Sequence, residues 1–413
     1  MFKKSNASTS FFKKTAIQTR ANLTVYPILI AISIAHLFND LLQALIPAVY
    51  PILKENYDLN FAQIGMITLC FQLSSSLLQP VVGAYTDKNP KPYSQIIGMF
   101  FTLFGILVLA YAKDYYWVLL AVTLVGIGSS IFHPESSRVA FMASGGKRSL
   151  AQSIFQIGGN AGTAMAPLLV AWVVLPAGQQ HLLWFVFVVL LAQLVLYYIG
   201  SWYKGVLVSR RTQQKKLVAV PDLSRRKIVL SISVLLLLIF SKYFYVASIT
   251  SYFQFYTMDK FGITEVQAQV YLFYFLIAVA LGTLIGGFYG DRFGRKYIIW
   301  FSVLGVAPFT LLLPYASLTW TAILVVIIGF ILASAFPSIL VYAQELLPKK
   351  IGMVSGLFYG FAFGMGGVGS AVLGWWADHT SIEYIYTICS YLPLIGIIAY
   401  LLPDMKKISF IKQ

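Results

Sequence analysis

Apolar segments long enough to cross a membrane follow one another along the whole chain. A helix needs about 20 mostly apolar residues to span a bilayer, and by that measure the sequence predicts twelve spans. Several exceed this minimum, so we expect them to tilt or to extend past the lipid. The expected limits are 26–53, 62–85, 93–112, 116–140, 150–175, 182–203, 228–257, 266–289, 297–314, 318–345, 351–377 and 384–403.

The composition supports this prediction. Hydrophobic residues make up 59% of the 413 residues and charged residues only 11%, whereas a soluble domain carries about 25% charged residues. The first apolar run starts at Tyr26 and is too long for the core of a signal peptide, so we expect a retained first span. The predicted fold class is an all-α polytopic membrane protein.

Lysine and arginine are distributed asymmetrically between the two sides of these spans. With the N-terminus inside, inner segments hold 26 of the 30 basic residues, and outer loops hold only Lys54, Lys113 and Lys260. Such a bias sets the orientation of a membrane protein, so we expect both termini in the cytoplasm. The net charge of +16 is therefore interpreted as a topology signal, and nucleic acid is not an expected partner.

The spans divide into two groups of six. Segment 204–227 carries eight basic residues and one acid, Asp222, and is predicted to be a cytoplasmic linker that contacts anionic lipid. The expected organisation is an N-terminal tail (1–25), a six-helix half (26–203), the linker (204–227), a second six-helix half (228–403) and a C-terminal tail (404–413).

The two halves repeat each other. Residues 83–88 (GAYTDK) and 287–292 (GFYGDR) follow the second and eighth spans at an offset of 204, and Phe132 and Phe336 share that offset. Parallel repeats of this kind are typical of transporters whose substrate site lies between the halves near the midplane.

The loop at 287–296, GFYGDRFGRK, fits the G-x-x-x-D-R-x-G-R-K signature of the major facilitator superfamily, which the chain therefore resembles. Gly287 permits close helix approach. Asp291 is expected to pair with Arg292 or Arg295, or to accept hydrogen bonds from a helix N-terminus. We expect this loop to act as a gating latch and not as a substrate site.

Two further segments depart from the patterns of the superfamily. In the first half Asp87 is retained, but residues 89–92 (NPKP) replace the glycine and the basic pair. The fifth span, GGNAGTAMAP ending at Pro167, matches the antiporter motif G-x-x-x-G-P-x-x-G-G only in part, and small residues followed by proline also suit plain helix packing. Pro167 is included among the expected gating residues.

Ionisable groups inside membrane spans are costly and mark functional sites. They fall in the first, fourth, seventh and tenth spans, the four that line the central cavity in the major facilitator fold, and no other span carries a charge away from its ends. These residues are His36, Asp40, His133, Glu135, Arg138 and Lys242, and Glu345, which ends the tenth span.

Helical spacing groups these residues with polar neighbours. His36, Asp40 and Gln43 share one face of the first span. In the seventh span Lys242, Tyr245 and Tyr252 lie roughly on one stripe, and in the tenth Ser338 shares a stripe with Glu345.

In the fourth span Glu135 and Arg138 are three residues apart and can form an ion pair, and Pro134 is expected to kink the helix. Each group also has a structural alternative. The ion pair could only hold the cytoplasmic rim, the histidines could be packing residues, and the aromatic stripe could be helix packing.

Several classes are disfavoured by the sequence. A nucleotide-binding G-x-x-x-x-G-K-[ST] motif is lacking, no catalytic constellation is recognisable, and the four histidines have no metal-like spacing along the chain. We therefore expect no enzyme activity, no cofactor and no metal.

Segments 71–83, 129–146 and 240–253 (FQLSSSLLQPVVG, SSIFHPESSRVAFMASGG and FSKYFYVASITSYF) resemble the fosmidomycin-resistance exporters of the superfamily, and the similarity extends over 28–404. The resemblance implies a proton-driven drug antiporter of the inner membrane whose substrate is a small phosphonate antibiotic.

On this hypothesis Asp40, Glu135, Glu345 and His36 are candidates for carrying the proton. The substrate, an anionic or amphipathic drug, would contact Lys242, Arg138, Gln43, His133, Tyr245, Tyr252 and Ser338. The alternative is uptake or exchange of an organic anion or phosphate ester. We expect a monomer.

Overall fold

The computed structural model describes residues 23–59, 61–174, 176–212 and 219–412. The first half of the chain forms α2 (Tyr26–Ala48), α3 (Tyr50–Asn56), α4 (Phe61–Lys88), α5 (Ser94–Ala110), α6 (Tyr115–Ala143), α7 (Arg148–Leu169), the π-helical turn η1 (Val170–Val174), the 3₁₀ helix η2 (Gln179–Trp184) and α8 (Phe185–Thr212).

The second half forms α9 (Arg225–Phe261), α10 (Glu265–Phe293), α11 (Arg295–Leu304), α12 (Ala307–Leu312), η3 (Leu313–Tyr315), α13 (Leu318–Ala333), α14 (Ala335–Leu346), α15 (Ile351–His379), α16 (Ile382–Cys389) and η4 (Leu392–Leu401). Strand β1 (Ala219–Pro221) precedes it, and η5 (Met405–Lys407) and β2 (Phe410–Lys412) end the chain.

Each of the twelve expected spans has a helical counterpart among these elements. Ten segments of the described chain are long and apolar enough to cross a membrane by themselves. The other two counterparts are the shorter apolar helix α5 and the more polar α7, whose polar residues pack inside the protein. The prediction of an all-α polytopic membrane fold is confirmed.

Local signals in the sequence place several helix ends. Asp114 caps α6 by accepting hydrogen bonds from the backbone N–H groups of Tyr116 (2.8 Å) and Trp117 (3.2 Å). Thr264 and Gln267 form a capping box at the start of α10. Gly262 ends α9 in the left-handed region, with φ of +62°.

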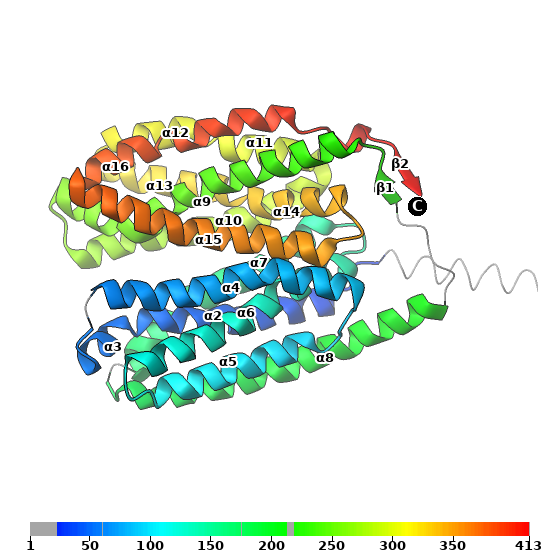
Figure 1. Cartoon of the computed structure of the whole chain (residues 1–413). Coiled ribbons are helices and arrows are strands. Elements are labelled where there is room, and N and C mark those ends of the chain that lie inside the picture. Colours follow the sequence, from blue (N-terminus) through cyan, green and yellow to red (C-terminus); the bar gives the residue numbers. More distant parts are fainter. Residues whose placement is uncertain (1–22, 60, 175, 213–218, 413) are drawn as a thin grey trace, which may run out of the picture.

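The helices form two bundles that lie one above the other in Figure 1, with α2–α8 in one and α9–η4 in the other. They meet where α4 packs on α15 and where α7 packs on α10. Glycines allow this approach: a Cβ on Gly83 would lie 2.1 Å from the carbonyl oxygen of Gly352, and one on Gly287 would lie 1.9 Å from Oγ of Ser153.

The described parts of the predicted linker and of the C-terminal tail contain helices and a short strand pair. Helix α8 continues to Thr212 and α9 begins at Arg225, because lysine and arginine are good helix formers and do not end a helix. Strand β1, which lies between these helices in the chain, pairs with β2 of the C-terminal tail as an antiparallel ribbon, with Val220 opposite Ile411. We call the side of the molecule that carries this ribbon the ribbon end (Figure 1).

The fourth and tenth spans differ in continuity at their prolines. Helix α6 continues as one helix through Pro134, and the kink that the sequence predicts there stays a prediction. Its counterpart in the second half is divided at Ser334 into α13 and α14. The described residues therefore place the interruption near Pro337, where the missing N–H of proline leaves a carbonyl one turn earlier without its partner.

Helix α7 packs tightly on α2, which leads to the first prediction. A Cβ on Gly158 would lie 1.8 Å from the carbonyl oxygen of Ser33, whereas one on Gly205 of α8 would meet nothing within 4 Å. Gly158→Val should therefore lower the free energy of unfolding by about 1–3 kcal/mol more than Gly205→Val, as overpacking does elsewhere. Thermal unfolding of the two purified variants measures the difference, and equal losses would contradict the packing described here.

Candidate functional site

A cavity of about 540 Å³ lies between the two bundles. Helices α2, α4, α7, α9 and α15 line it, and Tyr50 of α3 adds an aromatic ring. The lining residues are Asp40, Gln43, Ala44, Pro47, Tyr50, Thr68, Phe71, Gln72, Ser75, Ser76, Thr163, Tyr243, Val246, Ala247, Thr250, Ala362, Phe363, Gly366, Gly367 and Ser370. Of these, Asp40 alone is charged.

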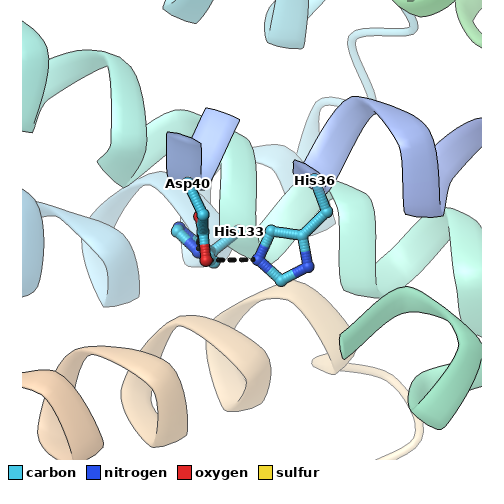
Figure 2. Close-up of side chains that lie close together, drawn as sticks. All are labelled: His36, Asp40 and His133. Carbon is cyan, nitrogen blue, oxygen red and sulfur yellow. Dashed lines mark ion pairs between the residues drawn. The ribbon is translucent and has the colours of Figure 1, made fainter. Parts of the chain in front are cut away.

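Asp40 lies against two histidines at the border of this cavity (Figure 2). Its Oδ2 is 3.1 Å from Nε2 of His36, one helical turn earlier on α2, and its Oδ1 is 3.5 Å from Nε2 of His133 on α6. Both imidazoles are fully buried, and the carboxylate is 14% exposed. We call these three residues the His–Asp–His triad.

The other nitrogen of each ring faces a backbone carbonyl. Nδ1 of His36 lies 2.8 Å from the carbonyl oxygen of Phe155, and Nδ1 of His133 lies 3.1 Å from that of Ser129. A carbonyl oxygen only accepts hydrogen bonds, so these two contacts are made by the tautomer that carries its hydrogen on Nδ1; Nδ1 of His133 also lies 3.3 Å from the hydroxyl of Ser129. In a neutral imidazole Nε2 is then a lone pair, and both lone pairs face the carboxylate of Asp40.

Aromatic packing and amide groups hold the triad in place. The ring of His36 stacks on Phe155 with centroids 4.0 Å apart, and His133 meets Phe363 edge-on. Asn39 Nδ2 and Gln43 Nε2 donate to Oδ1 of Asp40 at 2.9 and 3.2 Å. The carboxylate therefore keeps a fixed orientation while one side of it borders the cavity.

Lys242 is buried one helical turn before Val246, a cavity-lining residue of α9. Its side chain is 5% exposed, and its Nζ lies 5.6 Å from the ring centroids of both Tyr243 and Phe336. Among the described residues it has no ion-pair partner. Such a desolvated cation beside aromatic faces is able to attract an anion that enters the neighbouring cavity.

At the ribbon end, Asp87 of α4 bridges the two halves. Its carboxylate accepts hydrogen bonds from the backbone N–H groups of Gly352 and Met353, both at 2.9 Å, in the first turn of α15. Arg138 donates to Asp87 at 2.7 Å and to Glu135 at 2.5 Å. The basic partner that is missing from the first-half loop is therefore supplied by α6.

The second half repeats this arrangement. Asp291 of α10 accepts hydrogen bonds from the backbone N–H groups of Ser149 and Leu150, both at 3.1 Å, in the first turn of α7. Arg295 pairs with Asp291 at 3.1 Å. In both copies a carboxylate from one half meets the positive end of a helix dipole in the other.

Glu345 joins this contact and links the two halves. It pairs with Arg148 at 2.8 Å and with Arg295 at 3.1 Å. Arg292 is exposed and lies beside its neighbour Phe293, so only one of the two expected arginines pairs with Asp291. We refer to these inter-half contacts of Asp87, Asp291 and Glu345 as the latch.

The structure separates the predicted site residues into distinct places. Asp40 and Gln43 border the cavity, with His36 and His133 directly behind them. The ion pairs of Glu135, Arg138 and Glu345 lie at the ribbon end and not at the cavity, because the fourth and tenth spans pack there against helices of the opposite half.

The residues of the predicted stripe in the seventh span do not line the cavity, because a neighbouring face of α9 does. Tyr243, Val246, Ala247 and Thr250 line the cavity, while Tyr245 packs in a second apolar core. Tyr252 donates to the carbonyl oxygen of Ser370 at 2.5 Å. The helix is apolar nearly all round, so its spacing could not show which face meets the cavity.

Two further expectations are resolved only in part. Ser338 lies beside Gly290 of α10, where a Cβ would come within 2.5 Å of its Oγ, and it does not line the cavity. The side chain of Pro167 lies outside what the structure describes, although its backbone continues α7.

Sequence reasoning missed the polar stripe of α4. Thr68, Gln72, Ser75 and Ser76 all line the cavity. Gln72 lies four residues after Thr68, and Ser75 and Ser76 lie three and four residues after Gln72, a spacing that places all four on one helical face. Three of them lie in the segment FQLSSS, but uncharged polar residues do not stand out from an apolar helix as ionisable groups do.

The expectation of no metal site stays a prediction, but the fold changes the basis on which it was made. It rested on distances along the chain, whereas the fold brings His36, Asp40 and His133 together with their ligand atoms within 4.8 Å of one another. Helix α6 supplies the third group, His133, which lies nearly a hundred residues further along the chain than His36 and Asp40. Two imidazoles and a carboxylate are a ligand set that transition-metal ions accept.

Comparisons with known proteins agree with this architecture. The Major Facilitator Superfamily model matches residues 32–368 and again 235–411. The chain is 61% identical to the fosmidomycin resistance protein of Escherichia coli (strain K12), over 94% of this chain and 96% of that protein. It is 43% identical to the uncharacterized MFS-type transporter YfnC of Bacillus subtilis (strain 168), over 96% and 97%.

Solved structures match the fold at low sequence identity. The human organic anion transporter MFSD10 (TETRAN) has a TM-score of 0.73 at 16% identity, covering 92% of this chain and 100% of that one. FucP in its outward conformation has a TM-score of 0.71 at 16% identity with the same coverage. The solved structures agree with the fold, and the family model together with the relatives of 61% and 43% identity shows that the chain belongs to the major facilitator superfamily and is a multi-pass membrane transporter.

Proposed function

We propose that the protein exports a small anionic drug, most directly fosmidomycin, in exchange for protons across the inner membrane. Asp40 carries this proposal, because it is the charged group among the described residues that line the cavity. The 61% identity to a fosmidomycin resistance protein supports the choice of drug. The basic residues at the ribbon end support a cytoplasmic location for that end.

Coupling follows from alternate occupation of Asp40. When ionised, its free oxygen sites accept a hydrogen bond from a donor group of the drug, and protonation removes that acceptor. Proton uptake from the outer side therefore releases the drug, and proton loss to the cytoplasm restores the binding site. His36 and His133, each within 3.5 Å of the carboxylate, give the proton a second place to reside.

Lys242 supplies the attraction for the anionic part of the drug. It is a buried cation without an ion-pair partner among the described residues, next to Tyr243 and Phe336. A phosphonate oxygen that reached it would form a charge-assisted hydrogen bond. Arg138 and Glu345 are assigned instead to the latch, which closes the cytoplasmic side in this conformation.

The proton role of Asp40 is tested with Asp40→Asn in proteoliposomes loaded with fosmidomycin. An imposed pH gradient should drive drug movement through the unchanged protein and through the control Asp404→Asn, whose carboxylate caps η5 outside the membrane helices. The same gradient should drive none through Asp40→Asn, because the amide binds no proton in this range. Unchanged gradient-driven transport by Asp40→Asn would contradict the assignment.

The same protein expressed in sensitive cells distinguishes export from the alternative. Export lowers accumulated fosmidomycin and does so less when a protonophore is added. A rise in accumulated drug would favour uptake or exchange of an organic anion.

The role of Lys242 predicts a change in apparent affinity. Lys242→Gln should raise the half-saturating fosmidomycin concentration about ten- to a hundredfold, since a hydrogen bond to a charged group is worth about 1.5–3 kcal/mol. Lys242→Arg should restore most of the loss, and Lys260→Gln, far from the cavity near Pro314, should have no effect. Equal affinities for Lys242→Gln and the unchanged protein would remove the lysine from the drug site.

The latch role of Asp291 predicts easier opening of the ribbon end. Asn keeps one acceptor oxygen but loses the charge that meets the dipole of α7, which is worth about 0.3–1 kcal/mol and up to about 2 when partly buried. A cysteine at Ser137, fully buried between the halves, should then react with a thiol reagent up to several times faster in Asp291→Asn. Asp404→Asn serves as the control, and identical rates would show that Asp291 does not hold the halves together.

A further inference from the structure

We propose that the His–Asp–His triad is a binding site for a divalent transition-metal ion of the zinc class, and that the ion blocks transport when it binds. The block rests on the proposed function, because it requires that protons use the same residues. Binding itself does not depend on that function.

The Nε2 atoms of both histidines face the carboxylate of Asp40. Both Nδ1 atoms face backbone carbonyl oxygens and carry the hydrogens in the tautomer that makes these contacts, which leaves lone pairs on Nε2 of His36 and Nε2 of His133. Neither Nε2 has a hydrogen-bond donor within the described structure. Two nitrogen lone pairs and a carboxylate that face one another in a buried site repel unless a proton or a metal ion lies among them.

The ligand atoms of the triad lie at separations that suit a tetrahedral metal ion. Zinc binds imidazole nitrogen and carboxylate oxygen at about 2.0–2.2 Å, so tetrahedral ligand atoms lie about 3.3 Å apart. Nε2 of His36 lies 3.1 Å from Oδ2 of Asp40 and Nε2 of His133 lies 3.5 Å from Oδ1, and one ligand atom from each of the three residues lies within 4.8 Å of the others. Small side-chain movements suffice to bring the three groups around one ion.

The groups around the triad hold its three side chains in the orientation that a metal ion requires. Metal-bound histidines usually donate their other N–H to a carbonyl or carboxylate, which fixes ring orientation, and both rings already do so. Asn39 and Gln43 donate to Oδ1 of Asp40 and leave Oδ2 to face His36. The rings of Phe155, Phe363 and Tyr359 pack around the histidines and limit the movement of the ligands.

The region beside the triad is free of side chain on the side of Gly159 and opens to the cavity at Asp40. A Cβ on Gly159 of α7 would lie 2.5 Å from Nε2 of His36 and 2.6 Å from Oδ2 of Asp40. The glycine therefore keeps the region next to two of the ligand atoms free of side chain. Asp40 also borders the cavity, which gives an ion a route to the site and a side from which water can complete its coordination.

Competition with protons follows from the shared lone pairs. A metal ion binds only deprotonated imidazole and carboxylate, so its binding releases any protons held there. An ion held by α2 and α6 at the cavity border would then prevent the protonation cycle of Asp40. The chemistry thus points to inhibition of proton-driven transport by micromolar zinc, reversed by a chelator.

The full-length protein, stripped with a chelator and purified in detergent, is titrated with Co²⁺ and with Zn²⁺. Co²⁺ should give the visible absorption of a nitrogen- and oxygen-ligated ion at one equivalent, Zn²⁺ should displace it, and weakly buffered solution should show proton release. Absence of a saturable one-equivalent signal in the unchanged protein would overturn the proposal without recourse to any variant.

Variants locate the ion. His36→Ala, His133→Ala and Asp40→Asn should each weaken Zn²⁺ binding at least tenfold, because removal of even an outer-shell partner costs 10–100-fold. His379→Ala is the matched control, since His379 is exposed and lies at the end of α15. Equal weakening by the control, or none by the triad variants, would show that the ion binds elsewhere.

Transport assays separate this inference from the proposed function. If pH-driven transport occurs but Zn²⁺ neither binds nor inhibits, only the metal site is wrong. If Zn²⁺ binds at the triad but a pH gradient drives no transport in its absence, the metal site stands and the proton role of the triad is wrong.

Discussion

The cost of burying ionised groups inside a membrane protein organises this structure. Each such group needs an opposite charge, a hydrogen-bonding partner or water. The described residues satisfy this need for the buried carboxylates in two separate places, whereas Lys242 is buried without an ion-pair partner among them. At the ribbon end, Arg138 and Arg295 neutralise carboxylates that also cap helices. At the cavity border, Asp40 is held by amides and histidines and keeps one side towards the open space. The first arrangement is closed and the second is left able to exchange its partner.

The closed arrangement depends on the internal repeat. Asp87 and Asp291 accept hydrogen bonds from the second and third residues of α15 and α7, and each carboxylate comes from the opposite half. Equivalent helix starts and equivalent loop acids make the two contacts nearly interchangeable, yet their basic partners differ. Arg295 lies one turn after its acid, whereas Arg138 reaches Asp87 from α6. The repeat therefore conserves the helix-capping contact and lets each half find its own cation.

The sequence predicts the spans well because membrane hydrophobicity is a local property of about 20 residues. It also identifies Asp40 and Lys242 as unusual, since a buried charge stands out in an apolar helix. It misplaces Arg138 and Glu345 because their partners lie in other helices or in the other half, which no spacing along one helix can show. It misses the triad for the same reason: His36 and Asp40 share a face of α2, but His133 arrives from α6. The face of α9 is misassigned because a helix that is apolar all round gives no moment to orient it.

The central claim is that the drug and the proton occupy Asp40 by turns. Its most direct measurement is the proton balance of drug binding: fosmidomycin is added to the detergent-purified, chelator-treated protein in weakly buffered solution near neutral pH, and the released protons are counted with a pH indicator. The account predicts saturable proton release that follows drug occupancy, because binding requires the ionised carboxylate. Binding of the drug with no proton release, or with proton uptake, would contradict it.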